Sequence, residues 1–266
     1  MSFSLDGKTA IVTGAANGIG LAIARHFVDR GANVMFADMD ETRLVDELGD
    51  VQEDSNIRYF SGDLREKLTI ANLLSGTIDA FDSVDILVNG SRQILSTSPL
   101  DADDDSMTIL MQQNLMTSLR LSQLVARRMI KQAEGRENGA VGSIINLSSI
   151  AARRANPELM AYSVSTAALD QMTRSLAVAL APERIRVNAV AFGSVMSSSL
   201  KETLKDHTDY REKIEDRTPL GRIAAPHELA EAVQYLASEA SSFMTGQILT
   251  VDGGRTLLDP VSAPAH

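Results

Sequence analysis

The chain has 266 residues, 44% of them hydrophobic, and a formal net charge of −10. This length and apolar content are enough for one sizeable core. The net negative charge and the lack of a basic patch argue against nucleic acid as a partner and against binding to anionic membranes. Because the chain has no signal-like segment and no apolar run of about 18 residues, we expect a cytoplasmic protein. The absence of cysteine excludes disulfides, and the four scattered histidines indicate no metal site.

The first pattern is a short apolar run that ends in glycine and leads into a helix. Residues 8–14 are typical of a buried strand, and Ile19, Ile23 and Phe27 recur at a spacing of four, as in an amphipathic helix. A glycine-rich turn between a strand and a helix lets the backbone approach a pyrophosphate. The alternative is an ordinary glycine-rich loop. The predicted nucleotide-phosphate site comprises Gly14, Asn17, Gly18, Ile19 and Gly20.

A second short strand, residues 33–38, ends in an acid. Asp38 follows the glycine turn at the place where a carboxylate can accept hydrogen bonds from the adenosine ribose and repel a 2′-phosphate. No arginine lies between Gly14 and Gly20 to receive such a phosphate. The sequence therefore predicts NAD as cofactor and makes NADP the less favoured choice. The alternative for Asp38 is a solvated acid that opens the next helix.

Strand-like and helical segments alternate along the rest of the chain. The predicted strands are 10–13, 34–37, 57–61, 86–89, 143–147, 186–191 and 248–251. This alternation predicts an α/β fold, a Rossmann-like doubly wound parallel β-sheet flanked by helices on both faces. Because no linker or repeat divides the chain, we expect a single domain over residues 1–255. The tail, 256–266, is expected either to be poorly ordered or to cross a subunit boundary.

From residue 8 to residue 254 the chain resembles the short-chain dehydrogenase/reductase family. The family's Thr-Gly-x-x-x-Gly-Ile-Gly is complete at residues 13–20, and Ser149 precedes Tyr162 by the family's usual interval. Further matches are Asp63 in Ser-Gly-Asp-Leu, Asn89 in Leu-Val-Asn, Asn114 in Gln-Gln-Asn-Leu, and the segments 219–222, 226–230 and 245–254. The resemblance extends the expected cofactor site to Asp63, Leu64, Asn89, Thr166 and Gly193.

The resemblance also implies a reaction. Tyr162 would be the general acid/base, Ser149 would hold the substrate oxygen, and Asn114 would stabilise a helix kink and a water-linked proton path. The expected reaction is hydride transfer between NAD(H) and a small-molecule secondary alcohol or ketone. A phenol with an ordinary pKa of about 10 is a poor base at neutral pH, so the family places a lysine one helical turn later to favour the phenolate.

Three departures from the family pattern surround that chemistry. Thr166 stands at the lysine position, residues 90–92 (Gly-Ser-Arg) replace the end of the family's Asn-Asn-Ala-Gly, and Phe192 replaces the proline before Gly193. Threonine supplies no charge, although its hydroxyl can reach a ribose hydroxyl. A replacement cation could come from Arg92, Arg153 or Arg154; the alternative is that all three face solvent.

Residues 193–217 correspond to the family's substrate lid. Met196, Leu200, Leu204 and Tyr210 are sufficient to cover a small or medium apolar ligand, and the segment has several charges but no cluster that demands a phosphate or carboxylate. The substrate class therefore stays open among sugar alcohols, 3-oxoacyl thioesters, steroids and other ketones.

Two functions of different kinds follow from these patterns. The first is an NAD-dependent oxidoreductase; the second is a catalytically impaired relative that keeps the fold as a regulatory or assembly protein. The helices expected around residues 107–125 and 167–180 are apolar on more than one face, which indicates a second packing partner. Because relatives pair through these helices, we expect a homotetramer or at least a homodimer.

Overall fold

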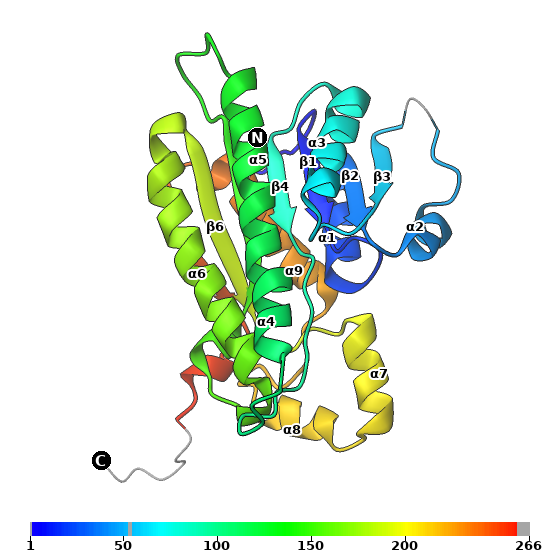
Figure 1. Cartoon of the computed structure of the whole chain (residues 1–266), viewed down its shortest axis with the longest axis vertical. Coiled ribbons are helices and arrows are strands. Elements are labelled where there is room, and N and C mark those ends of the chain that lie inside the picture. Colours follow the sequence, from blue (N-terminus) through cyan, green and yellow to red (C-terminus); the bar gives the residue numbers. More distant parts are fainter. Residues whose placement is uncertain (1, 53–54, 260–266) are drawn as a thin grey trace.

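The computed structural model describes residues 2–52 and 55–259 and contains one seven-stranded parallel sheet covered by helices on both faces (Figure 1). The strands are β1 (Thr9–Thr13), β2 (Asn33–Asp38), β3 (Ile57–Ser61), β4 (Ile86–Asn89), β5 (Gly142–Ser149), β6 (Ile185–Phe192) and β7 (Ile248–Val251). Their order in the sheet is β3-β2-β1-β4-β5-β6-β7. The predicted fold class is confirmed.

The α-helices lie between the strands in the sequence. They are α1 (Gly18–Asp29), α2 (Glu41–Leu48), α3 (Lys67–Phe81), α4 (Ser106–Leu110), α5 (Thr117–Gln132), α6 (Met160–Leu180), α7 (Ser198–Asp206), α8 (Tyr210–Asp216) and α9 (Pro226–Ala237). In the part of the chain that the structure describes, no helix is both long and apolar enough to span a bilayer.

The sheet separates two hydrophobic layers because side chains alternate along each strand. Along β2, Val34 and Phe36 face the layer that contains α1 and α9, whereas Met35 faces the layer that contains α3 and α5. Phe27 of α1 and Leu121 of α5 are fully buried or nearly so on these opposite sides. Burial on both faces explains why the strands appear in the sequence as continuous apolar runs.

The order of the strands reverses beside β1. The chain moves outward from β1 through β2 to β3 and then returns to pair β4 with the other side of β1. In open α/β sheets this reversal leaves a crevice outside the carboxyl ends of the strands. The glycine turn after β1 and the segment after β4 both begin at this crevice.

Strands β5 and β6 are longer than the sequence predicted. They pair in parallel along their entire length, with Ser149 in register with Phe192. Ser148 and Ser149 therefore stay in the sheet although they are polar, because the neighbouring strand satisfies their backbone groups. This register brings the predicted catalytic serine beside the segment that begins at Gly193.

The predicted lid forms two short helices, α7 and α8, which lie below the sheet and are drawn in yellow in Figure 1. The predicted boundary at residue 255 falls in a short 3₁₀ turn, Arg255–Leu257. Of the tail, residues 256–259 are part of the described structure, and the remainder lies outside it.

An ion pair joins two of the family-like segments near the end of the chain. Both oxygens of Glu228, in the first turn of α9, accept hydrogen bonds of 2.7 Å from Arg222, and Oε2 also accepts one of 2.8 Å from the backbone N–H of Ala225. The Arg222 guanidinium is the main cause that lowers the pKa of Glu228 from 4.5 to about 2. The carboxylate thus caps α9 and ties it to the preceding loop.

We expect Glu228→Gln to lower the melting temperature at pH 7 by about 1–3 °C, since the pair is exposed to solvent and screened. Because folding lowers this pKa, the carboxylate stabilises the fold above pH 4.5 and loses that effect as the pH falls towards 2. Thermal unfolding across this range should show the difference between variant and wild type shrinking. Glu231→Gln, on an exposed face of the same helix, is the control; a difference that persists unchanged at low pH would contradict the role of the charge.

Candidate active site

The glycine-rich turn after β1 requires glycine at three positions. Gly14 has a φ of +70°, and a Cβ added there would lie 2.7 Å from the carbonyl oxygen of Gly90. Gly18 has a φ of +55°, and a Cβ on Gly20 would lie 2.0 Å from the carbonyl oxygen of Gly14. At Gly14 and Gly20 the backbone therefore packs too closely for a side chain, whereas at Gly18 the positive φ favours glycine.

This turn forms one wall of a cavity of about 440 Å³. The predicted phosphate-binding residues meet here with the acid of β2, and the cavity is lined in part by Gly14, Asn17, Gly18, Ile19, Gly20 and Asp38. The Asp38 carboxylate is fixed by the backbone N–H groups of Ala16 and Asp40, each at 3.1 Å. The structure thus brings these residues together around one cavity.

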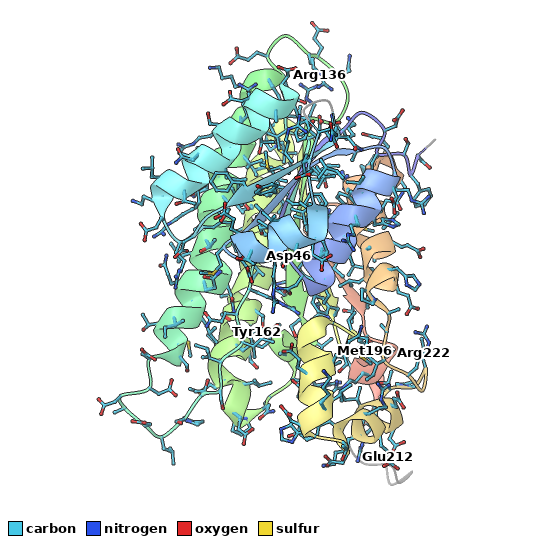
Figure 2. All side chains as sticks on the ribbon, turned by 90° about the vertical axis from the view of Figure 1, so that its right-hand side faces the viewer. Asp46, Arg136, Tyr162, Met196, Glu212 and Arg222 are labelled. Atoms are coloured by element: carbon cyan, nitrogen blue, oxygen red, sulfur yellow. The ribbon has the colours of Figure 1, made fainter. Side chains whose placement is uncertain are left out.

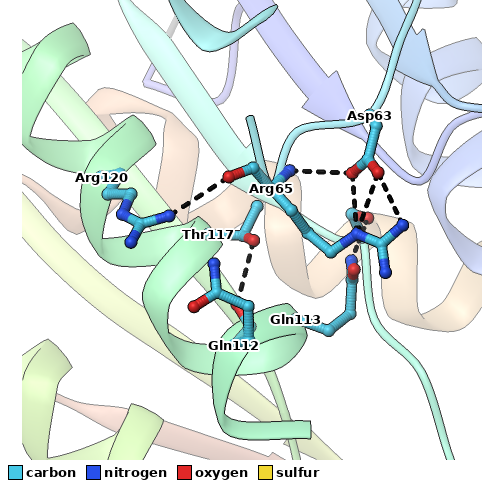
Figure 3. Close-up of polar contacts among 7 residues, drawn as sticks. Asp63, Arg65, Gln112, Gln113, Thr117 and Arg120 are labelled. Carbon is cyan, nitrogen blue, oxygen red and sulfur yellow. Dashed lines mark hydrogen bonds and ion pairs between the residues drawn. The ribbon is translucent and has the colours of Figure 1, made fainter. Parts of the chain in front are cut away.

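Asp63 is engaged by a neighbouring arginine (Figure 3). Arg65 donates from Nε and Nη2 to the two carboxylate oxygens of Asp63, with the shortest distance at 2.6 Å. This hydrogen bonding is the main cause that lowers the pKa of Asp63. Arg65 lines the cavity of the glycine turn, whereas Asp63 and the buried Leu64 are not among the described residues of its lining.

A second, larger cavity of about 720 Å³ lies at the ends of β5 and β6. Ser149, Tyr162 and Gly193 all line it, so the fold brings together three residues that are well separated in the sequence. The Tyr162 side chain is almost fully buried, and the Ser149 hydroxyl accepts a hydrogen bond from the N–H of Ala151 at 3.1 Å. Figure 2 shows Tyr162 in the lower half of the molecule, at the level of Met196.

Arg92 connects the two cavities. Its guanidinium donates from Nη1 to the phenolic oxygen of Tyr162 at 3.3 Å and lies over the ring of Phe192, 4.3 Å from the ring centroid. Arginine stacks well on aromatic faces while keeping its charge and its remaining donors. The contact therefore places a permanent cation beside the one phenol of the larger cavity.

The loop that carries Arg92 is held at several points. The Thr13 hydroxyl oxygen accepts hydrogen bonds from the N–H groups of Gly90 and Ser91, both at 3.0 Å. The Asn114 side-chain amide forms two hydrogen bonds with the backbone of Gln93: its oxygen accepts from the N–H at 2.9 Å, and its nitrogen donates to the carbonyl at 3.0 Å. The loop thus presents Arg92 on a fixed backbone.

Asn114 can reach this loop because its own helix is locally distorted. Residues Met111–Met116 form a π-helical segment between α4 and α5, a rare form that occurs frequently at functional sites. The Asn114 amide also donates to the Ser165 hydroxyl of α6 at 3.2 Å. Asn114 therefore joins the α4–α5 helix, the Arg92 loop and the helix of Tyr162.

Comparisons with known proteins identify the family of this chain. The family described as Enoyl-(Acyl carrier protein) reductase matches residues 14–256. A cis-4-hydroxycyclohexanecarboxylate dehydrogenase from Sinomonas cyclohexanicum is 35% identical over 94% of this chain and 96% of its own length. The chain belongs to the short-chain dehydrogenase/reductase family.

Two solved structures of this kind are similar over nearly the whole chain. One is a 7α-hydroxysteroid dehydrogenase complexed with NADH and 7-oxo glycochenodeoxycholic acid, with a TM-score of 0.85, 33% identity, and coverage of 95% of this chain and 96% of that one. The other is a gluconate 5-dehydrogenase from Burkholderia cenocepacia J2315 in complex with NADP and tartrate, with a TM-score of 0.85, 32% identity, and coverage of 97% and 98%. Both nicotinamide cofactors therefore occur among the relatives of this short-chain dehydrogenase/reductase.

Two residues assigned to the cofactor from the family pattern have buried side chains outside the linings of both cavities. Asn89 donates to Asn146 at 2.8 Å and to Ser122 at 3.0 Å in a buried network. Thr166 donates to the backbone carbonyls of Tyr162 and Ser163, at 2.9 and 3.1 Å. The Thr166 hydroxyl thus bonds to its own helix.

The other two candidate cations have other described partners. Arg153 donates to Thr250 at 2.8 Å and lies 4.0 Å from Asp170, while Arg154 donates to the carbonyl of Thr256. Of the three arginines considered from the sequence, Arg92 is the one with a described contact to Tyr162. Its stacking on Phe192 could not be found from local sequence, because residues 92 and 192 meet only through the order of the strands.

Proposed function

We propose that this chain is an NAD(H)-dependent oxidoreductase that interconverts a secondary alcohol and a ketone, with Tyr162 as general acid/base. The observation that carries the proposal is the contact between Arg92 and the hydroxyl of Tyr162, a residue that lines the larger cavity together with Ser149. A catalytically impaired relative would have no need for this buried arrangement, so the contact favours an enzyme.

The residues around the smaller cavity suit a dinucleotide. The turn at Gly14, Gly18 and Gly20 lines this cavity with backbone, which suits a pyrophosphate, and the fixed carboxylate of Asp38 suits the ribose hydroxyls. When bound, the nicotinamide cofactor supplies or accepts the hydride. Arg65 and Arg43 are already paired with Asp63 and Asp40, which leaves them poorly placed to receive a 2′-phosphate and favours NAD over NADP.

The protein's own groups handle the proton. In ketone reduction the Tyr162 hydroxyl gives its proton to the substrate oxygen, and in alcohol oxidation the phenolate takes it back. The Ser149 hydroxyl holds that oxygen in place by a hydrogen bond. The Arg92 guanidinium stabilises the phenolate in both directions of the reaction.

In this proposal Arg92 supplies the charge that threonine at position 166 lacks. The guanidinium approaches Tyr162 from the loop after β4, whereas position 166 lies on the same helix as the tyrosine. The Phe192 ring supports the guanidinium from below. The changes at positions 92, 166 and 192 thus form one connected replacement rather than three separate losses.

We expect Arg92→Met to reduce kcat by about 10–100-fold, since it removes a charge-assisted hydrogen bond to the phenolate. In alcohol oxidation the rise of kcat with pH should move to higher pH. Thr166→Lys should change wild-type activity little but should partly rescue Arg92→Met. Steady-state kinetics across pH test this, with Arg174→Met, an exposed arginine on α6, as control. Full activity in Arg92→Met with an unmoved pH profile would remove Arg92 from the mechanism.

We expect wild-type protein to bind NAD(H) more tightly than NADP(H). Asp38→Ala should narrow this difference in affinity by about tenfold, because NAD(H) loses a charge-assisted hydrogen bond from its ribose to the carboxylate and NADP(H) no longer has its 2′-phosphate repelled by it. Calorimetric titration with both cofactors measures the two affinities. Asp46→Ala, which removes an exposed acid from the following helix α2, is the control. Equal affinities in wild type, or an Asp38→Ala variant with an unchanged ratio, would contradict this role.

We further propose a cytoplasmic homotetramer, or at minimum a homodimer. Helix α6 exposes Met160, Val164 and Val178, the last with 78% of its surface accessible, and these apolar groups are unusual on a helix that packs only against its own core. Light scattering at micromolar concentration should give a mass of two or four chains. Val178→Asp should weaken the assembly, and a monomeric wild type would refute it.

A further inference from the structure

Three arginines from three separate segments border the larger cavity. Arg154 follows β5, Arg217 directly follows α8, and Arg255 follows β7. The local sequence does not predict this cluster, because the three arginines come together only in the folded chain. They line the same cavity as the Ser149 and Tyr162 hydroxyls.

The arginines of this border are less well paired than their sequence neighbours. Arg153, Arg211 and Arg222 each form an ion pair with an acid, at 4.0, 3.2 and 2.7 Å. Within residues 2–52 and 55–259, the ion pairs include none from the three border arginines. Their described side-chain hydrogen bonds use neutral acceptors: Arg154 donates to the Thr256 carbonyl, and Arg255 donates to Ser194 at 3.0 Å.

Acidic groups offset only part of this charge. Asp259 lines the same cavity, and Asp252 lies near enough to Arg255 to feel its charge. Asp252 accepts hydrogen bonds from the N–H groups of Gly254 and Thr256, at 2.9 and 2.7 Å, so its carboxylate is directed at the backbone. Arg154 and Arg217 therefore leave the mouth of the cavity net positive.

The remainder of the cavity wall is largely apolar. Ile150, Leu159, Phe192 and Leu258 contribute to it, and its volume of about 720 Å³ is in the range of pockets that hold small organic ligands. A ligand that fits this wall has an apolar body, one oxygen at Ser149 and Tyr162, and a negative group at the border.

We propose that the substrate is an oxo or hydroxy carboxylic acid, with its carboxylate remote from the reacting carbon and bound by Arg217 and Arg154. Guanidinium groups suit carboxylates because their paired N–H donors match the two oxygens. The inference rests on the proposed oxidoreductase function and adds the substrate class to it. It also differs from the sequence reading of the lid, in which residues 193–217 alone showed no anion-binding cluster.

The test uses pairs of substrates that differ only in charge. A series of oxo acids, with the ketone three to ten carbons from the carboxylate, is compared with the corresponding methyl esters in the presence of NADH. For the best chain length we expect kcat/KM at least tenfold higher for the acid than for the ester, falling as salt is added. Calorimetric binding of the same acids and esters provides a readout that does not need turnover.

The variants are Arg217→Met and Arg154→Met, with Arg211→Met as the matched control on α8, since Arg211 pairs with Glu215. Each border variant should lower the ratio of kcat/KM for acid over ester about tenfold or more, mainly by raising KM for the acid, whereas the control variant should keep the wild-type ratio. Arg217→Lys should retain part of it. Equal binding of acid and ester by wild type, or a preference unchanged in both border variants, would overturn the inference.

The two proposals fail in different ways. If esters and neutral ketones are reduced as well as the acids, the oxidoreductase stands and the anion site is lost. If the acids bind in preference to the esters and the border variants abolish that preference, but no substrate turns over, the anion site stands and the proposed reaction is lost.

Discussion

The position of the candidate catalytic groups depends on how the loop after β4 is tied to the end of β1. The Thr13 hydroxyl accepts two amide hydrogens of this loop, and the close approach of Gly14 to Gly90 leaves no space for a side chain between them. Two parallel strands that are separated by more than 70 residues in the sequence thus share one polar junction. Because this junction lies where the strand order reverses, the fold fixes the loop at the crevice where such sheets bind ligands.

From this junction the geometry extends to the phenol through side chains that support each other. Phe192 is in register with Ser149, so the ring that carries the Arg92 guanidinium and the hydroxyl expected at the substrate lie on adjacent strands. Asn114 holds the loop from the opposite side through its π-helical segment. Each partner is fixed by packing or by backbone hydrogen bonds, which is the condition for a group to keep its orientation during a reaction.

The sequence was sufficient for the fold, because the alternation of apolar strands with amphipathic helices and the glycine turn are local patterns. It was also sufficient to group the glycines with Asp38, since the motif spans only one strand, one turn and one helix. It could not establish that Arg92 reaches Tyr162, nor that Asn89 and Thr166 turn into the interior. Those outcomes depend on strand order and register, as does the meeting of Arg154, Arg217 and Arg255.

The Arg92–Tyr162 hydrogen bond has a consequence for how ligands in the two cavities affect each other's affinity. Arg92 borders the cavity of the glycine turn, whereas Tyr162 borders the larger one, so this single bond is part of the partition between them. A molecule that moves the guanidinium on one side alters the phenol on the other. Such coupling is reciprocal in binding free energy. If the first ligand changes the affinity for the second by some factor, the second changes the affinity for the first by the same factor.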